Sequence, residues 1–181
     1  MSDSELPRFE VFVQERSNGP HLHAGSVHAS DGELALLNAR DVFARRPECH
    51  SLWIVPADRV VARTEEQLRT DPFPGEPASS EAELYLLFGK IGHKGTHTYL
   101  ASVLAVSPAQ ALQHGLAAFE PQGVTSWWLV PERFRRTNQP EEAGPWFDPA
   151  LDKPFRDQAF YPVETFMRNL RRARARKDAS G

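Results

Sequence analysis

A pattern of strand, capped helix and strand that occurs twice constrains the fold of this chain more than any other feature. Residues 25–56 carry the first occurrence, and a weaker one follows about 76 positions later over residues 101–131. The two end alike, as Ser-Leu-Trp-Ile-Val-Pro and as Ser-Trp-Trp-Leu-Val-Pro. An internal repeat decides the architecture, because each copy is expected to form the same structural unit. The sequence therefore predicts two related units.

Each unit is predicted to contain two strands, a helix and a third strand, from alternating and helical apolar patterns respectively. The strands are expected at residues 9–14, 21–29, 51–55, 84–88, 96–106 and 126–130, and the helices at 35–43 and 111–119. Three strands with one helix are too small to be stable alone. The predicted fold class is α+β: two tandem strand-strand-helix-strand units packed as a pseudo-twofold dimer, with an irregular aromatic tail and a C-terminal helix.

Composition divides the chain into four segments. Residues 64–83 carry three prolines and an excess of acidic residues, which is typical of a mostly irregular linker. An arginine-rich helix is expected from Val163 onward. The expected boundaries are 1–63 for the first unit, 64–83 for the linker, 84–137 for the degenerate second unit, and 138–181 for the aromatic tail and basic C-terminal helix.

Local patterns give more detailed expectations. The first helix is predicted to begin with a capping box over residues 30–33, and the second with one over residues 107–110, where proline occupies the first helical position. The buried stripe of the first helix is expected to consist of Ala35, Leu36, Ala39, Val42 and Phe43. Strict alternation along residues 21–29 places His21, His23, Gly25 and Val27 on one face of the sheet and His28 on the other.

The bulk composition is that of a soluble globular protein, with 40% apolar and 25% charged residues and a net charge of −3. Cys49 is the only cysteine, which excludes an intrachain disulfide and a thiolate-rich metal site. No apolar run approaches the roughly 20 residues that span a bilayer. The first residues lack the apolar core of a signal peptide. A cytoplasmic location without membrane contact is expected.

Catalytic, metal and cofactor sites are not expected. His21 and His23 form a two-histidine clip, but no third ligand recurs, so polar residues on a half-exposed hairpin are the favoured interpretation. No dinucleotide, phosphate-binding or serine-nucleophile motif occurs. Cys49 and His50 are adjacent and would point apart in a strand.

The aromatic and basic residues favour packing or protein contacts. Trp53, Trp127 and Trp128 are predicted to pack in cores or interfaces, and Trp146 and Phe147 are typical of buried anchors, within the chain or against a partner. The basic C-terminus fits a solvated helix end or an acidic partner. Nucleic acid is not expected, because no aromatic residues alternate with the arginines.

Several motifs resemble the B subunit family of ring-1,2-phenylacetyl-CoA epoxidase. They are His-x-Gly-Ser-Val-His-Ala at residues 23–29, Ala-Leu-x-Asn-Ala-Arg-Asp at 35–41 and Ser-Leu-Trp-Ile-Val at 51–55. Trp-Phe-Asp-Pro-Ala at 146–150, with Lys153, Phe155, Arg156, Phe160 and Tyr161, resembles the tail of the same family. The departure is length, since the usual member is about half as long, corresponding to one unit.

The resemblance implies a role in a bacterial multicomponent monooxygenase of phenylacetate breakdown. In such a complex the CoA thioester and oxygen are held by a di-iron subunit, a related inactive subunit supports it, and a flavin and iron–sulfur reductase supplies electrons. The family member is then a small non-catalytic bridging component without a cofactor. Its implied partners are the di-iron and structural subunits, with the reductase as a further candidate.

The expected partner-binding residues are those that the second copy has lost, together with the tail. They are His23, His28, Asn38, Arg40, Asp41, Trp146, Phe147, Asp148, Arg156, Phe160 and Tyr161. Two alternatives stay open, a free-standing interaction or scaffold module and a histidine-hairpin metal-binding protein. Further self-association also stays open.

Overall fold

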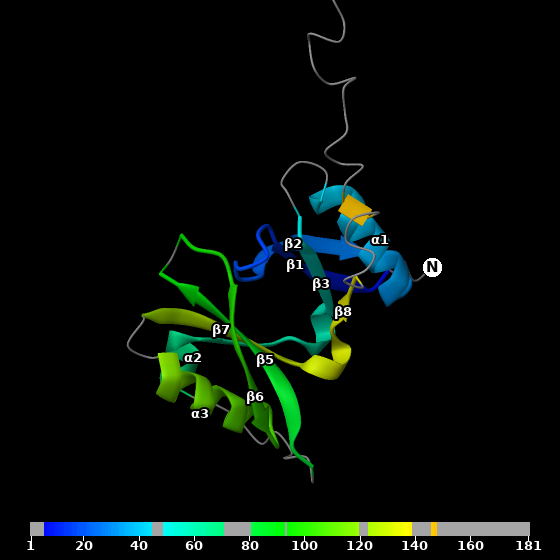
Figure 1. Ribbon diagram of the computed structural model, residues 1–181. Coiled ribbons are helices and arrows are strands. Elements are labelled where there is room, and N and C mark those ends of the chain that lie inside the picture. The colour runs from blue at the N-terminus through cyan, green and yellow to red at the C-terminus, as the bar shows by residue number, and fades with distance from the viewer. Residues whose placement is uncertain are drawn as a thin grey trace, which may run out of the picture.

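One continuous β-sheet with a helix packed on each of its halves forms the body of the molecule. The computed structural model describes residues 6–44, 49–70, 81–92, 94–119, 123–138 and 146–147. Helices α1 and α3 lie at opposite ends of the body, with the strands between them (Figure 1). The α+β fold class is therefore confirmed. The main elements are β1 (Arg8–Gln14), β2 (Leu22–His28), α1 (Gly32–Phe43), β3 (Ser51–Pro56), β5 (Glu83–Ile91), β6 (Thr98–Ala105), α3 (Pro108–Phe119) and β7 (Val124–Pro131).

The strand order of the sheet is β4-β7-β5-β6-β2-β1-β3-β8. After β3 a 3₁₀ turn, η1 (Ala57–Arg59), leads to β4 (Val61–Thr64), which pairs with β7 of the other half. After β7 the turn η3 (Glu132–Phe134) leads to β8 (Arg136–Thr137), which pairs with β3. The strand that follows the first half in the sequence, β4, is therefore the outermost strand of the second half. The strand that follows the second half, β8, is likewise the outermost strand of the first half.

The two halves meet along the beginnings of β2 and β6. Leu22 lies opposite Thr98, and the backbone N–H of His23 donates to the carbonyl of His97 at 2.8 Å. The N–H of Tyr99 donates in turn to the carbonyl of His21 at 2.9 Å. Because the overlap is short, the sheet is continuous at this seam over only a few residues.

Three hydrophobic cores stabilise the body. The first lies between α1 and β1, β2 and β3, and the second between α3 and the strands of the other half. The third lies on the sheet faces that carry no helix and combines Phe12 and Val55 with Leu86, Phe88 and Val130. The rings of Phe12 and Phe88 stack with centroids 4.1 Å apart. Because this core takes residues from both halves, it joins them into one body.

The ends and faces of the helices differ in part from the predictions. The N-cap of α1 is Asp31, whose carboxylate accepts from the Leu34 N–H at 2.9 Å, because the Ser30 hydroxyl donates to Asp31 instead of accepting from the helix. Val42 is 60% exposed, so its place in the buried stripe was predicted wrongly. In α3 the prediction is confirmed: the Gln110 N–H donates to Ser107 Oγ at 3.2 Å, and the helix begins at Pro108.

A β-bulge changes which residues of β2 share a face. Phe12 lies opposite His23 and Val11 opposite Gly25, so Ala24 has no partner on β1. Gly25 accordingly faces α1 and has a φ of 145°. A Cβ added at this position would lie only 2.9 Å from the Phe43 ring, which is too close unless the ring shifts. The prediction that His23 and Gly25 lie on the same face of the sheet is therefore wrong. His28, opposite Arg8, falls on the same face as His23, because a residue inserted at Ala24 reverses the alternation.

The segment expected to be an irregular linker begins with a short helix, α2 (Glu65–Thr70). Its capping box was not recognised among the acidic and proline residues: the Gln67 N–H donates to Thr64 Oγ1, and the Thr64 N–H donates to Gln67 Oε1. Residues 71–80 lie outside the described residues, as do the predicted C-terminal helix and most of the tail.

Candidate interaction site on the first half

Two equivalent histidine arrangements flank the seam between the halves. In the first half His21 Nε2 lies 3.1 Å from Ser51 Oγ, and its ring stacks on Trp53 with centroids 3.5 Å apart. In the second half His97 Nε2 lies 3.1 Å from Ser126 Oγ, and its ring stacks on Trp128 at 3.9 Å. The repetition of every contact indicates that these histidines serve the structure of the seam.

Both imidazoles are held in their neutral form. Burial, then the charges of Arg135 and His50, lowers the pKa of His21 from 6.5 to about 4. Burial, then the charges of His23 and Lys90, lowers the pKa of His97 to about 4 against an opposing effect of Glu10. A neutral ring suits stacking on indole and a hydrogen bond to serine.

These two pKa values predict a loss of stability in mild acid. Below about pH 6.5 the unfolded chain binds protons at both positions, while the folded chain stays neutral there down to about pH 4. The free energy of unfolding should therefore fall as the pH falls through this window, by roughly 1–2 kcal/mol after allowance for solvent screening. Urea unfolding at a series of pH values would measure it. The double variant His21→Gln/His97→Gln should show a flatter dependence, and an equal slope in both proteins would refute the assignment.

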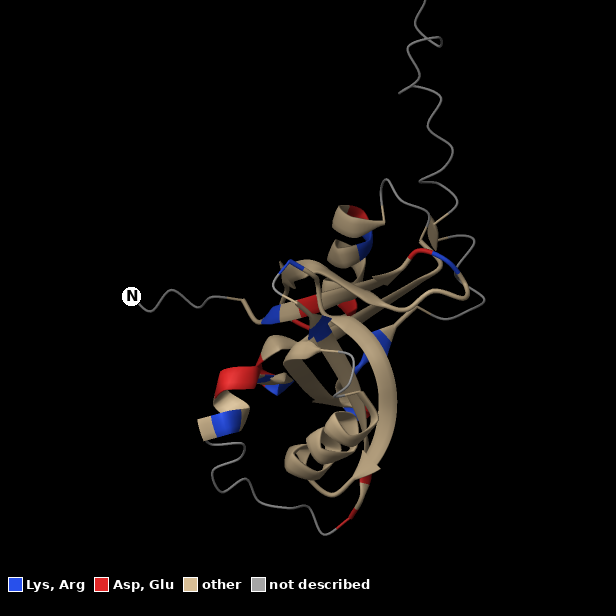
Figure 2. Cartoon of the chain, turned by 90° about the vertical axis from the view of Figure 1, so that its left-hand side faces the viewer, with Lys and Arg blue, Asp and Glu red and all other residues tan. Residues whose placement is uncertain are grey.

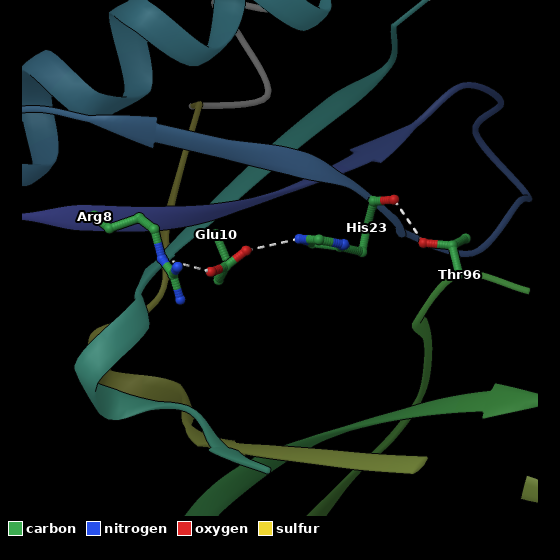
Figure 3. A network of polar contacts seen from close by, with 4 residues as sticks. All are labelled: Arg8, Glu10, His23 and Thr96. Atoms are coloured by element: carbon green, nitrogen blue, oxygen red, sulfur yellow. Dashed lines mark hydrogen bonds and ion pairs between the residues drawn. The ribbon is translucent and has the colours of Figure 1, made fainter. Parts of the chain in front are cut away.

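The first half carries a polar network of Arg8, Glu10 and His23 that has no counterpart at the equivalent described positions of the second half. Glu10 is 6% exposed, and its carboxylate lies between two basic side chains, with Arg8 Nε at 3.1 Å and His23 Nε2 at 2.8 Å (Figure 3). The Thr96 hydroxyl donates to the carbonyl of His23 at 2.7 Å and so ties the network to the other half. The His23 ring also lies edge-on to Trp128, with centroids 4.9 Å apart.

The equivalent positions of the second half are apolar or neutral. Leu84 and Leu86 replace Arg8 and Glu10, and Tyr99 replaces His23 and bonds Ser102 Oγ through its hydroxyl at 2.9 Å. The same strand geometry therefore forms without a charged residue at these three positions. Sequence reasoning missed Glu10 and Arg8, although a lone glutamate between apolar residues of a strand is a signal for a buried ion pair.

Asn38, Arg40 and Asp41 lie on α1, next to the end of β2. Asn38 Nδ2 donates to the carbonyl of His28 at 3.2 Å, and Arg40 pairs with Asp41 at 3.1 Å. The side chain of Asp41 is 70% exposed. Leu34 and Leu37 are 41% and 42% exposed and occupy the same outward side of the helix. These two leucines were not among the predicted site residues.

The two described tail residues contact α1 and the core beneath it. The Arg40 guanidinium lies over the Trp146 ring, 5.3 Å from its centroid, and Trp146 is partly buried against the first core. Phe147 is 5% exposed and belongs to that core. Its side chain therefore packs within the chain itself and is not presented at the surface. Asp148, Arg156, Phe160 and Tyr161 lie outside the described residues.

A shallow open pocket of about 590 Å³ adjoins the polar network. It is lined by Arg8 and His28 together with Leu6, Pro7, Ala57 and Asp58. Of the predicted residues, His28 and Asn38 thus lie together at the end of β2, Arg40 contacts Asp41 and Trp146, and His23 lies at the seam.

The described residues contain no group of three or more histidine, cysteine, aspartate or glutamate side chains able to hold a metal ion. Burial and the charge of Glu15 raise the pKa of the Cys49 thiol to about 12, against a hydrogen bond to Ser51. The thiol therefore stays protonated and is a poor nucleophile at neutral pH. Among the described helices none is long and apolar enough to cross a membrane, and the cytoplasmic location stays a prediction.

Comparisons with known proteins confirm the family resemblance. The model of the family described as Phenylacetic acid degradation B matches residues 5–75 and 81–167. The B subunit of 1,2-phenylacetyl-CoA epoxidase from Escherichia coli (strain K12) is 45% identical over 67 residues, which are 37% of this chain and 70% of that protein. No solved structure matches the chain significantly. Since the family model covers well over half of the chain, the protein belongs to the phenylacetic acid degradation B family.

Proposed function

We propose that this chain is a non-catalytic bridging subunit of a multicomponent di-iron monooxygenase that epoxidises phenylacetyl-CoA in aerobic phenylacetate degradation. The observation that carries the proposal is the 45% identity to the B subunit of an epoxidase acting on that CoA ester. The bridging role is supported by the chemistry of the described side chains. The two seam histidines are neutral and engaged in packing, and the Cys49 thiol is protonated.

The proposal includes a tandem architecture in which one chain forms both halves of a pseudo-twofold dimer. The strand order supports it. Read inward from one end of the sheet the order is β4-β7-β5-β6, and read inward from the other end it is β8-β3-β1-β2, so that each strand of one half has a counterpart at the same place in the other. The bulges opposite Val11/Phe12 and Leu87/Phe88 also correspond. The proposed units are residues 1–63 and 84–137, and the segments 64–83 and 138–181 are additions to them.

Partner binding is assigned to the outward side of α1 and the adjoining end of β2. Exposed Leu34 and Leu37, flanked by Arg40 and Asp41, offer apolar area inside a polar rim, which is the usual arrangement of a protein–protein contact. The equivalent side of α3 carries no charged residue and holds Gln113 and Ala117 in place of Leu37 and Asp41. The proposed occupants are the di-iron and structural subunits, and the reductase is a further candidate.

Reconstitution of the complex with and without this chain tests the proposal. Phenylacetyl-CoA turnover should fall when the chain is omitted, and the chain should co-purify with the di-iron subunit. The variant Leu37→Asp/Asp41→Arg should lower both co-purification and turnover at least about tenfold, a cost of about 1.4 kcal/mol or more in binding. The matched control Gln113→Asp/Ala117→Arg changes the equivalent positions of α3 and should leave both unchanged. Unchanged turnover without the chain would refute the assignment and favour a free-standing scaffold module.

A further inference from the structure

Among the described residues, strand β6 has one side of its backbone paired along its length and the other side mostly unpaired. On one side it pairs with β5 from Thr98 to Ala105, while on the other it pairs with β2 only at Thr98. No other described strand lies beside residues 100–105. An open strand edge presents unpaired N–H and C=O groups that a further strand can bind.

The equivalent edge of the first half shows which backbone groups point outward. Ala29 N–H donates inward to the carbonyl of Pro7, while the carbonyl of His28 faces outward and accepts from Asn38. Leu104 pairs with Leu84 as His28 pairs with Arg8. The backbone groups of Leu104, and by alternation those of Ser102, therefore point away from β5.

One outward carbonyl of β2 is occupied by a side chain, whereas the equivalent carbonyl of β6 is occupied by no described side chain. On the first half Asn38 occupies the carbonyl of His28. On α3 the position of Asn38 is taken by His114, and within the described residues no side chain donates to the carbonyl of Leu104. Strand β6 also lacks the lysine, charge or proline that commonly protects an edge.

The apolar residues beside this edge are exposed. Leu104 is 61% exposed and its cross-strand neighbour Leu84 is 37% exposed, where the first half carries His28 and Arg8. Strand β6 and helix α3 contain no lysine, arginine, aspartate or glutamate (Figure 2). Two such edges can therefore approach each other without bringing like charges together, although the chain has a net charge of −3.

We propose that a second copy of this chain docks on the open edge, with the two β6 strands antiparallel about a twofold axis. An antiparallel edge is self-complementary, as a twofold interface requires. In the register centred on Val103, Ser102 of each copy faces the partner's Leu104, and each such pair exchanges both backbone hydrogen bonds. Val103 then faces the partner's Val103 at a non-hydrogen-bonded position, where side chains come closest. The two sheets become continuous, and Leu104 gains side-chain neighbours from the partner strand.

Sedimentation equilibrium on the full chain tests the proposal. The wild-type protein should be dimeric, and Leu104→Lys should raise the dimer dissociation constant at least about tenfold, because two like charges would lie at diagonal positions on the same face of the paired strands. The matched control His28→Lys changes the equivalent position of β2, whose outward carbonyl is occupied by Asn38, and should leave the dimer intact. A wild-type chain that is monomeric at about 100 μM, as expected if the edge serves a different protein, would overturn the proposal.

A cysteine pair tests the register independently of dimer strength. In a Cys49→Ser background, Val103→Cys should give a disulfide-linked dimer on mild oxidation, because facing non-hydrogen-bonded residues lie within the Cα separation that a disulfide needs. Ser102→Cys faces a leucine and should cross-link far less. Equal cross-linking of the two variants, or none from Val103→Cys in a folded protein, would refute the proposed pairing. The outcome is independent of whether the chain supports phenylacetyl-CoA turnover.

Discussion

Replacement of Phe12 by alanine should lower the free energy of unfolding by about 3–5 kcal/mol. Phe12 is completely buried and stacks on Phe88 at 4.1 Å. Its ring also contacts those of His23 and Trp128. The substitution opens a cavity in the core that both halves share, and neither half can close it alone, because each is held by its own helix-covered core. The predicted cost is therefore at the upper end for a core residue.

Denaturant unfolding followed by tryptophan fluorescence measures this loss. Phe88→Ala should cost a similar amount, and the double variant less than the sum, because both substitutions remove the same stacked pair. Val42→Ala is the control, since Val42 is 60% exposed and the change should stay within about 0.5 kcal/mol. A loss below about 1 kcal/mol for Phe12→Ala would show that the third core does not hold the halves together.

The positions of the longer strands and helices could be predicted from the sequence, because the apolar patterns that indicate them are local. Alternation and helical spacing located six strands and both long helices within a few residues. Strands β4 and β8 escaped prediction, because four and two residues carry no usable period. Their pairing depends on β7 and β3, which lie far away in the sequence.

The candidate site was predictable only in part, for a related reason. Comparison of the two copies indicated His23, His28, Asn38, Arg40 and Asp41, and the structure brings His28 together with Asn38 and Arg40 together with Asp41. The bulge at Ala24 could not be seen, since one extra residue in β2 leaves the local composition unchanged while reversing the faces beyond it. Burial of Phe147 was one of two options for the tail, and only tertiary contacts with the first core decide between them.

Exchange of the polar network for the residues of the second half should separate stability from function. Removal of one partner alone, as in His23→Tyr, leaves the buried Glu10 carboxylate with Arg8 only and should cost about 2–3 kcal/mol. The triple variant Arg8→Leu/Glu10→Leu/His23→Tyr reproduces Leu84, Leu86 and Tyr99. Because buried ion pairs can be replaced by packed apolar groups at little cost, its stability should stay within about 1 kcal/mol of the wild type. Urea unfolding of the three proteins measures both effects.

The same triple variant should nevertheless lose at least about tenfold in support of phenylacetyl-CoA turnover by the reconstituted complex. The second half forms the same strands, bulge and stacked histidine with no charged residue at the three equivalent positions, so the fold does not require the network. Burial of a carboxylate is costly, and its presence in the first half alone is explained if Arg8, Glu10 and His23 set the charge and shape of the surface that binds a partner. Full turnover by a folded triple variant would confine the network to a structural role. A triple variant less stable than His23→Tyr would show that the two halves are not interchangeable at these positions.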